Sequence, residues 1–213
     1  MSDGDRFLSE GRRGYHHGRL KDALIEAARS LVAERGPAGF TLAEAAKRVG
    51  VTAAAPYRHF NDRADLMSEL ARRGFTLFGD ALERAWNGGR PDPVQAFRHM
   101  GAAYLDFAMA EPGLYSAMFG NVKALDEPGP GQAADKALAT LRNAARAVLL
   151  LYGAPADGAD ALASEIWALS HGVAMLAMAG YFSDAHGRSP HALIEGAAPA
   201  LFEAHIRRAL QKR

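Results

Sequence analysis

The side chains best placed to do chemistry form a short polar run at Tyr57, Arg58 and His59. All three can donate hydrogen bonds to phosphate oxygens or to the edges of bases. The run follows the alanines at positions 53–55, which add no bulk to the preceding turn. A bare helical turn can approach a second surface closely, and the major groove of a duplex is such a surface. The pattern therefore favours recognition of a nucleic acid.

Patterns typical of catalysis are missing from the chain. It has no Walker-type phosphate loop, no dinucleotide fingerprint after a strand, no serine-elbow motif and no His-Glu-x-x-His pair. The eight histidines are scattered without the spacing of metal ligands, and there is no cysteine. We therefore expect a protein that is not an enzyme, with no catalytic residue, metal site or cofactor.

Two short helices joined by a tight turn are expected to position the polar run. Thr41 can cap the first helix, whose apolar residues recur at helical spacing up to Val49. Gly50 can supply the left-handed exit that a helix end needs. Thr52 is placed to cap the second helix, and Pro56 falls near the end of its first turn, where a helix can tolerate it. The spacing is that of a helix-turn-helix, although an ordinary helical hairpin shares it.

Charge is unevenly distributed along the chain. The net charge is only +1, but residues 11–63 contain ten Lys and Arg against five Asp and Glu, so the remainder carries −4. A basic N-terminal part on an acidic body suits a DNA-binding protein. Residues 1–17 are polar and glycine-rich, and we expect a flexible basic arm that can follow a phosphate backbone or reach a minor groove.

The segment from Gly50 to Leu66, GVTAAAPYRHFNDRADL, resembles the DNA-binding motif of the tetracycline-repressor-like (TetR/AcrR) transcriptional regulators. The resemblance extends over about residues 18–70, and the remainder is similar only in length and helical pattern. Two positions depart from the family pattern, since Arg63 stands where lysine is usual and Pro56 where a larger apolar residue is usual. The resemblance implies repression rather than activation.

The predicted DNA contacts combine side-chain chemistry with this resemblance. Contact with bases is assigned to Arg58 and to the alanine face before it. Contact with phosphates is assigned to the surrounding hydroxyl, imidazole and guanidinium groups and to the basic arm. The full set is Thr41, Thr52, Ala53, Ala54, Ala55, Tyr57, Arg58, His59, Arg63, Arg19 and His17.

Bulky apolar side chains are frequent in residues 64–213. Most of them should form the core, but methionines and aromatics can also line a tolerant pocket for a hydrophobic effector. Three of them, at positions 104, 167 and 171, have polar tips that could orient a ligand. The predicted pocket residues are Phe78, Met100, Tyr104, Phe107, Met118, Trp167, His171 and Met175.

The composition, rich in alanine and leucine and poor in β-branched runs, predicts an all-α fold. We expect an N-terminal three-helix helix-turn-helix domain over 18–63 and a C-terminal helical bundle domain over 64–213 for effector binding and dimerisation. Residues 166–182 contain no Asp, Glu, Lys or Arg. A membrane span would take roughly 20 apolar residues, so we expect a helix covered by a second subunit. The two C-terminal helices are thus the predicted homodimer interface.

Together these patterns predict a ligand-responsive transcriptional regulator, most simply a repressor. It would bind a palindromic double-stranded DNA operator as a homodimer and be released by a small hydrophobic effector. No signal peptide is evident, so a cytoplasmic protein without membrane contact is expected. Two alternatives remain at this stage: a helical interaction protein, whose binding would be insensitive to salt, and an enzyme with an apolar active site, which would show turnover.

Overall fold

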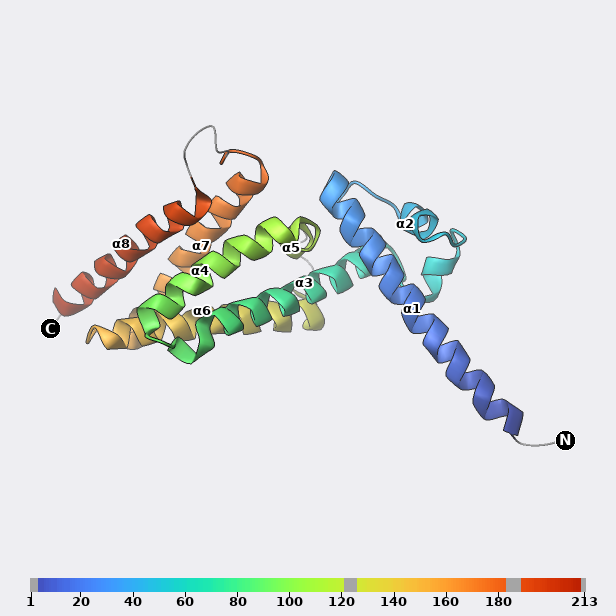
Figure 1. The fold of residues 1–213 in the computed structure, drawn as a ribbon, viewed down its shortest axis with the longest axis horizontal. Helices are drawn as coiled ribbons and strands as arrows, with labels where there is room; N and C mark the ends of the chain where they lie inside the picture. The colour runs from blue at the N-terminus through green and yellow to red at the C-terminus, as the bar shows by residue number, and fades with distance from the viewer. Residues whose placement is uncertain (1–3, 121–125, 183–188, 212–213) are drawn as a thin grey trace.

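The computed structural model describes residues 4–120, 126–182 and 189–211. In this part the chain is an elongated all-α molecule, with its N-terminal helices at one end and α8 at the other (Figure 1). The helices are α1 (Gly4–Arg35), α2 (Leu42–Val49), η1 (Ala55–Arg58), α3 (Arg63–Trp86), η2 (Asn87–Gly89), α4 (Pro93–Ala110), α5 (Pro112–Phe119), α6 (Pro128–Leu151), η4 (Ala156–Gly158), α7 (Ala159–Met178) and α8 (Pro190–Gln211). The predicted fold class is therefore confirmed.

The N-terminal domain is built around the apolar face of α1. Leu24 and Leu31 of this helix are buried, as are Leu42 of α2 and Phe60 after η1. Burying each such side chain contributes roughly 1.5–3 kcal/mol. These few contacts fix the direction in which α2 and η1 leave α1, and so decide which residues of the domain face outward.

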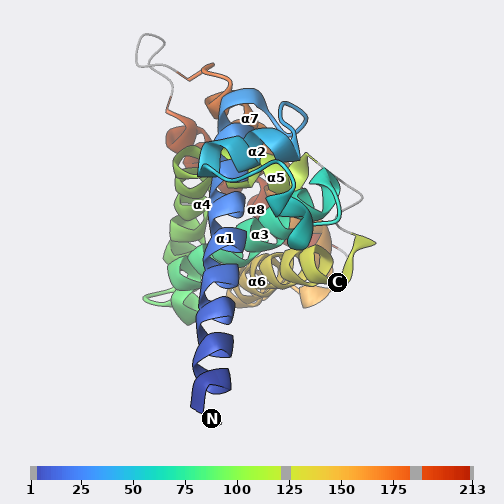
Figure 2. The same ribbon diagram turned by 90° about the vertical axis from the view of Figure 1, so that its right-hand side faces the viewer.

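The expected flexible arm over residues 1–17 differs from the structure, because α1 already begins at Gly4. Its first half projects away from the rest of the molecule, as Figures 1 and 2 show. No proline interrupts residues 4–35, and adding a residue to an existing helix costs far less than starting one. The packed second half of α1 can therefore extend the helix toward the N-terminus.

The long helix α3 leads from the N-terminal domain into the body. Asp62 caps it, accepting a hydrogen bond from the backbone N–H of Asp65 at 2.9 Å. Arg73 of α3 forms an ion pair with Asp22 of α1 at 2.5 Å and donates to Glu69 at 3.1 Å. The rest of α3 packs along α4, α5 and α6. Helix α3 thus connects the N-terminal domain with the body.

Helix α5 makes a second connection between the body and α1. Gly113 lies so close to α1 that a β-carbon on it would be 2.2 Å from the carbonyl oxygen of Arg29. The same arginine forms an ion pair with Glu111 at 2.5 Å. At the other end of α5, a β-carbon on Gly120 would be 2.5 Å from the ring of Pro37. Glycines at both ends therefore let α5 dock directly on the N-terminal domain.

Helix α6 begins with a proline, Pro128. A proline at the first helical position costs no hydrogen bond, which allows the helix to start there. Helix α8 also begins with a proline, Pro190, after Ser189, whose Oγ lies 3.4 Å from the backbone nitrogen of Ala192. Helices α7 and α8 pack on each other and both contact α4.

Candidate nucleic-acid interface and ligand cavities

The turn between α2 and η1 has the geometry that the sequence predicts. Thr41 caps α2: its Oγ accepts a hydrogen bond from the N–H of Glu44 at 3.2 Å, and its own N–H donates to the Glu44 carboxylate at 2.8 Å. Gly50 ends α2 with φ of 79°, in the left-handed region. The hydroxyl of Thr41 is therefore already part of the cap.

The second helix of the motif is shorter than predicted. Residues 55–58 form a 3-10 turn, and Thr52 does not cap an α-helix. In an α-helix beginning after Thr52, the nitrogen of Pro56 would have to donate to the Thr52 carbonyl, but proline has no N–H and its ring clashes with that carbonyl. The carbonyl instead accepts from the N–H of Ala55 at 3.0 Å. The expectation that the helix tolerates this proline is wrong.

The short turn nevertheless presents the expected side chains outward. Tyr57 is 62% exposed, and Arg58 and the alanines at positions 53 and 54 are also exposed. Ala55 and His59 are half-buried. The buried Pro56 and Phe60 anchor the turn on both sides of the tyrosine and arginine. A fixed and uncovered turn of this kind can contact another macromolecule.

Arg63 is partly occupied by its own domain. One guanidinium nitrogen donates to the carbonyl oxygen of Pro37, and the guanidinium carbon lies 5.6 Å from the centroid of the Phe40 ring. Arginine has five N–H donors, so this packing leaves some of them for a phosphate. The residue nevertheless has a structural role that its position in the sequence motif did not indicate.

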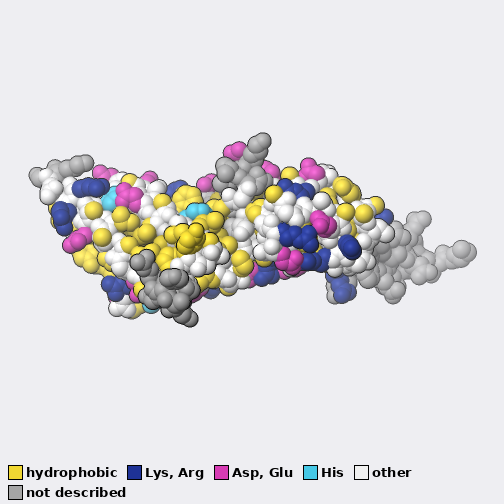
Figure 3. Space-filling view, turned by 90° about the horizontal axis from the view of Figure 1, so that it is seen from above, with side chains coloured by type: hydrophobic (Ala, Val, Ile, Leu, Met, Phe, Trp, Pro, Cys, Tyr) yellow, Lys and Arg dark blue, Asp and Glu magenta, His cyan; other side chains and the backbone are white. Residues whose placement is uncertain are grey.

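Two ion pairs reduce the free positive charge of the surface. Arg48 holds Glu34 through two hydrogen bonds of 2.7 and 2.8 Å, and Arg35 holds Glu44 at 2.7 Å. Several Lys and Arg side chains still gather at this end of the molecule (Figure 3). Arg19 is exposed on α1. The side chain of His17 lies outside the described residues.

A cavity of about 230 Å³ lies in the body between α3, α4, α6 and α7. Three of the eight predicted pocket residues, Phe78, Tyr104 and Trp167, line it together with Phe119 of α5. The ring centroids of Phe78 and Tyr104 lie 4.9 Å apart in an edge-to-face arrangement. Three of the predicted pocket residues therefore lie around one cavity.

Beside this cavity, three polar tips form a buried chain. The hydroxyl oxygens of Tyr104 and Tyr115 are 3.0 Å apart, and that of Tyr115 is 2.8 Å from Nδ1 of His171. Burial raises the pKa of Tyr104 to about 12 and also raises the pKa of Tyr115. Burial lowers the pKa of His171. All three groups are therefore neutral near pH 7 and act as hydrogen-bonding groups.

The other predicted pocket residues lie elsewhere. Met100, Phe107 and Met118 are buried in the core and line neither of the two cavities described here. Met175 is 48% exposed on the outside of α7. Helical periodicity identifies an apolar face, but it does not distinguish a packed position from one beside a hollow.

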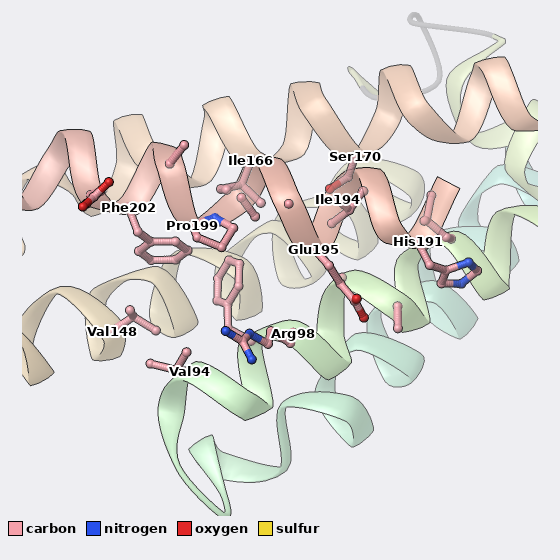
Figure 4. Close-up of a pocket in the computed structure, with 18 of the residues that line it drawn as sticks. Val94, Arg98, Val148, Ile166, Ser170, His191, Ile194, Glu195, Pro199 and Phe202 are labelled. Atoms are coloured by element: carbon pink, nitrogen blue, oxygen red, sulfur yellow. The ribbon is translucent and has the colours of Figure 1, made fainter. Parts of the chain in front are cut away.

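Sequence reasoning missed a larger cavity of about 680 Å³ between α4 and α8 (Figure 4). It involves none of the predicted pocket residues. Its walls include Gly101, Ala102 and Ala198, whose small size leaves space between the helices. Small residues on two helices are the sequence feature that could have indicated this cavity. The packing of α8 on α4 is needed to show that these small residues face each other.

The outer surfaces of α7 and α8 are uncovered within the described chain. A β-carbon on Gly172 of α7 would meet no atom within 4 Å, and Leu176 of α7 and Leu193 of α8 are 44% exposed. Hydrophobic side chains are prominent over this half of the molecule in Figure 3. Residues Ala156–Met178 are long and apolar enough to cross a membrane by length and composition alone. In the structure α7 instead packs against α4, α6 and α8.

The architecture is thus that of a helix-turn-helix protein with a helical body that contains cavities. The model of the tetR family of bacterial regulatory proteins matches residues 24–70, and the model of the tetracyclin repressor-like C-terminal domain matches residues 97–201. The chain belongs to the TetR family of transcriptional regulators.

Individual relatives agree with this assignment. The chain is 30% identical over 100 residues to the uncharacterized HTH-type transcriptional regulator YobS of Bacillus subtilis, an alignment that covers 47% of this chain and 51% of the relative. It is 28% identical to the uncharacterized HTH-type transcriptional regulator Rv0681 of Mycobacterium tuberculosis, covering 77% of this chain and 72% of the relative. A solved structure of a protein of unknown function from Rhodococcus sp. RHA1 has a TM-score of 0.75 and 27% identity, covering 90% of this chain and 98% of that one.

Proposed function

We propose that the protein is a ligand-responsive repressor that binds palindromic DNA as a homodimer and is released by a small hydrophobic effector. The observation that carries the proposal is the outward-facing turn at Tyr57 and Arg58, anchored by the buried Pro56 and Phe60. Hydrogen-bond donors on a fixed, uncovered turn match what recognition of a duplex requires. Action on chromosomal DNA implies a cytoplasmic location.

Arg58 is the proposed reader of a base edge, because arginine can donate two hydrogen bonds to guanine in the major groove. The exposed alanines at 53 and 54 allow close approach and can contact thymine methyl groups. Tyr57, which is 62% exposed, is a proposed phosphate contact. Further phosphate contacts are assigned to Thr41, Thr52, His59, Arg63, Arg19 and His17.

Measurements on a duplex selected from random sequence would test these assignments. Arg58→Ala should weaken binding to the selected duplex by about 1–3 kcal/mol and relax the base preference at one position in each half-site. Tyr57→Phe should weaken binding on all sequences alike. Arg146→Ala, which removes an exposed arginine on α6, is the matched control and should bind like the wild type. Unchanged affinity in Arg58→Ala would exclude this arginine as the reader.

Two copies are needed to read a palindrome. A two-fold axis through the uncovered faces of α7 and α8 would place two reader turns on one side of the duplex. Helix-turn-helix dimers bind half-sites about 34–36 Å apart, or multiples of that distance. The affinity should fall steeply with salt, because several phosphates are contacted at once. Binding that does not respond to salt would contradict the proposal.

The smaller cavity is the proposed effector site, and α5 is the proposed link to the DNA-binding domain. Phe119 at the end of α5 lines the cavity, while Gly113 of the same helix contacts the carbonyl of Arg29 in α1. A ligand that displaces the Phe119 ring would therefore move α5 and, with it, α1. Such coupling requires the ligand to prefer one arrangement of the helices over the other.

Filling the cavity with a side chain would test this route. Ala134 of α6 lines the cavity, whereas the equally half-buried Ala139 of the same helix does not. Ala134→Trp should keep DNA binding but lose the response to any small molecule that releases the wild type. Ala139→Trp should keep both properties. An effector response that survives in Ala134→Trp would place the effector elsewhere.

A further inference from the structure

The larger cavity is not used by the proposed effector mechanism. It lies between α4 and α8, with residues of α6 and α7 at its back (Figure 4). Its volume of about 680 Å³ is typical of sites for small molecules. The lining runs along α4 from Val94 to Leu105, which is about 16 Å at the rise of an α-helix. The cavity is therefore elongated along the two helices.

The walls of the larger cavity are mainly hydrocarbon. Phe97 and Phe202 both line it and contact each other, with ring centroids 4.8 Å apart in an edge-to-face arrangement. Leu105, Ile166 and Ile194 are buried residues that complete the walls. Removing apolar surface from water is favourable in proportion to its area, so these walls favour an apolar ligand.

One polar group stands apart in this lining. Ser170 of α7 is only 3% exposed, and its hydroxyl makes no hydrogen bond within the part of the chain that the structure describes. It lines the cavity beside Ile194, as Figure 4 shows. A serine hydroxyl can donate one hydrogen bond and accept two, so a ligand with one polar group could hydrogen-bond to Ser170 from within the cavity.

The charged lining residues lie at the edge of the cavity and include both signs. Arg98, Glu195 and Glu203 are exposed. The carboxylate of Glu203 is 3.9 Å from Arg207, and His191 lies 2.9 Å from a carboxylate oxygen of Asp106. A charged ligand group placed deep inside would lose its hydration and meet only a hydroxyl, which is unfavourable.

We propose that the larger cavity is a second ligand site, which binds a neutral, chain-like molecule whose single hydroxyl or carbonyl group hydrogen-bonds to Ser170 Oγ. Such a ligand would contact α4 and α8 at the same time. It would therefore stabilise the packing of α8 on the body, since any molecule that binds only the folded protein increases its stability.

Calorimetric titration of the full chain, without DNA, with three probes of equal chain length would test the proposal. The probes are 1-decanol, which is neutral, decanoate, which is an anion, and decylamine, which is a cation. We expect 1-decanol to bind one site at least about tenfold more tightly than either charged probe. Ser170→Ala should weaken 1-decanol binding about fivefold, which is the loss of one hydrogen bond. Equal or tighter binding of a charged probe would overturn the proposal.

A pair of neighbouring alanines on α4 locates the site. Ala102 and Ala103 are both half-buried, but only Ala102 lines the larger cavity. Ala102→Trp should abolish 1-decanol binding, whereas Ala103→Trp and the smaller-cavity variant Ala134→Trp should retain it. Binding that survives in Ala102→Trp, or is unchanged in Ser170→Ala, would refute the assignment. If Ala102→Trp does not fold, Ser170→Ala decides alone.

Discussion

His171 is held by groups that favour its neutral form. Its Nδ1 lies 2.8 Å from the Tyr115 hydroxyl, and its ring packs edge-to-face on Phe119 with centroids 4.5 Å apart. Burial lowers the pKa of this imidazole below its ordinary value. The folded state therefore binds a proton at His171 less readily than the unfolded chain does.

This difference predicts a loss of stability in acid. Above the ordinary histidine pKa of about 6.5, neither the folded nor the unfolded state is protonated at His171. As the pH falls below that value, the unfolded chain takes up the proton first, and the free energy of unfolding decreases. Urea unfolding at pH 7.5 and 5.5 should show this decrease in the wild type. The decrease should be smaller in His171→Asn, and an equal decrease in both proteins would exclude His171 as a source.

At the scale of single elements, η1 shows why a motif in the sequence does not fix the length of its helix. The caps at Thr41 and Gly50 act over one helical turn, and local chemistry was enough to predict them. The sequence shows that Pro56 departs from the family pattern, but the effect of this proline on the second helix of the motif depends on where that helix starts. If the helix started at Thr52, its first main-chain hydrogen bond would run from the N–H of residue 56 to the carbonyl of Thr52. Proline at position 56 has no N–H to make that bond.

Replacing Pro56 should therefore lengthen the reader helix. In Pro56→Ala the new amide can donate to the carbonyl of Thr52, converting the 3-10 turn into a first α-helical turn. Hydrogen exchange followed by NMR should show protection of the amide at position 56, and the base preference of the protein should change. An unprotected amide would mean that tertiary contacts, rather than proline, set the 3-10 geometry.

The cavities depend on which helix faces which, and that is why the sequence could only partly predict them. Tyr104 and Trp167 were predicted because their polar tips could orient a ligand, and Phe78 was predicted as a bulky apolar side chain. Met118 was predicted from the same helical periodicity, but it fills the space beside Gly74. A β-carbon added to Gly74 would lie only 2.7 Å from the Cγ of Met118. The larger cavity depends on the packing of Gly101 near Ile194, a contact across 93 residues of sequence.

Docking of α5 on α1 can be tested at one glycine. Gly113→Ala would place a β-carbon 2.2 Å from the Arg29 carbonyl oxygen, so α5 must move away from α1. We expect a stability loss of about 1–3 kcal/mol, typical of overpacking, and a weaker effector response. Gly79→Ala is the matched control, because its β-carbon would make an ordinary 3.5 Å contact with Ala137. The control should be neutral or more stable by up to about 1 kcal/mol, since alanine favours the helix.

The result for Gly113 separates two routes of coupling. If the effector acts through α3 alone, Gly113→Ala should lose stability but keep the full difference in DNA affinity with and without effector. If it acts through α5, the difference should shrink even at temperatures where the variant is fully folded. Fluorescence anisotropy with labelled DNA, measured well below the unfolding transition, distinguishes the two outcomes.

At the scale of the whole molecule, the residues that the structure describes leave a long apolar face on α7 and α8 without a covering layer. Helix α7 packs inward through Leu162, Ile166 and Val173, which are buried, but its opposite side carries the open Gly172 and the exposed Leu176. Helix α8 adds Leu193, which is 44% exposed. Small residues allow the backbones of two helices to approach closely, and exposed apolar area of this kind marks interaction surfaces. A second copy of the chain, meeting this one across a two-fold axis, is the proposed cover.

A single charge placed in this face should separate the copies. Gly172→Glu would bury an unpaired carboxylate at the proposed interface, a cost of about 3 kcal/mol or more. The dimer dissociation constant measured by sedimentation equilibrium should rise by about 100-fold or more. Asn143→Glu adds the same charge to an exposed position on α6 and should leave the dimer intact. The monomeric variant should lose affinity for the palindrome while its weak affinity for a single half-site remains, because the reader turn lies in the other domain. A Gly172→Glu protein that stays dimeric would show that the copies meet through a different face.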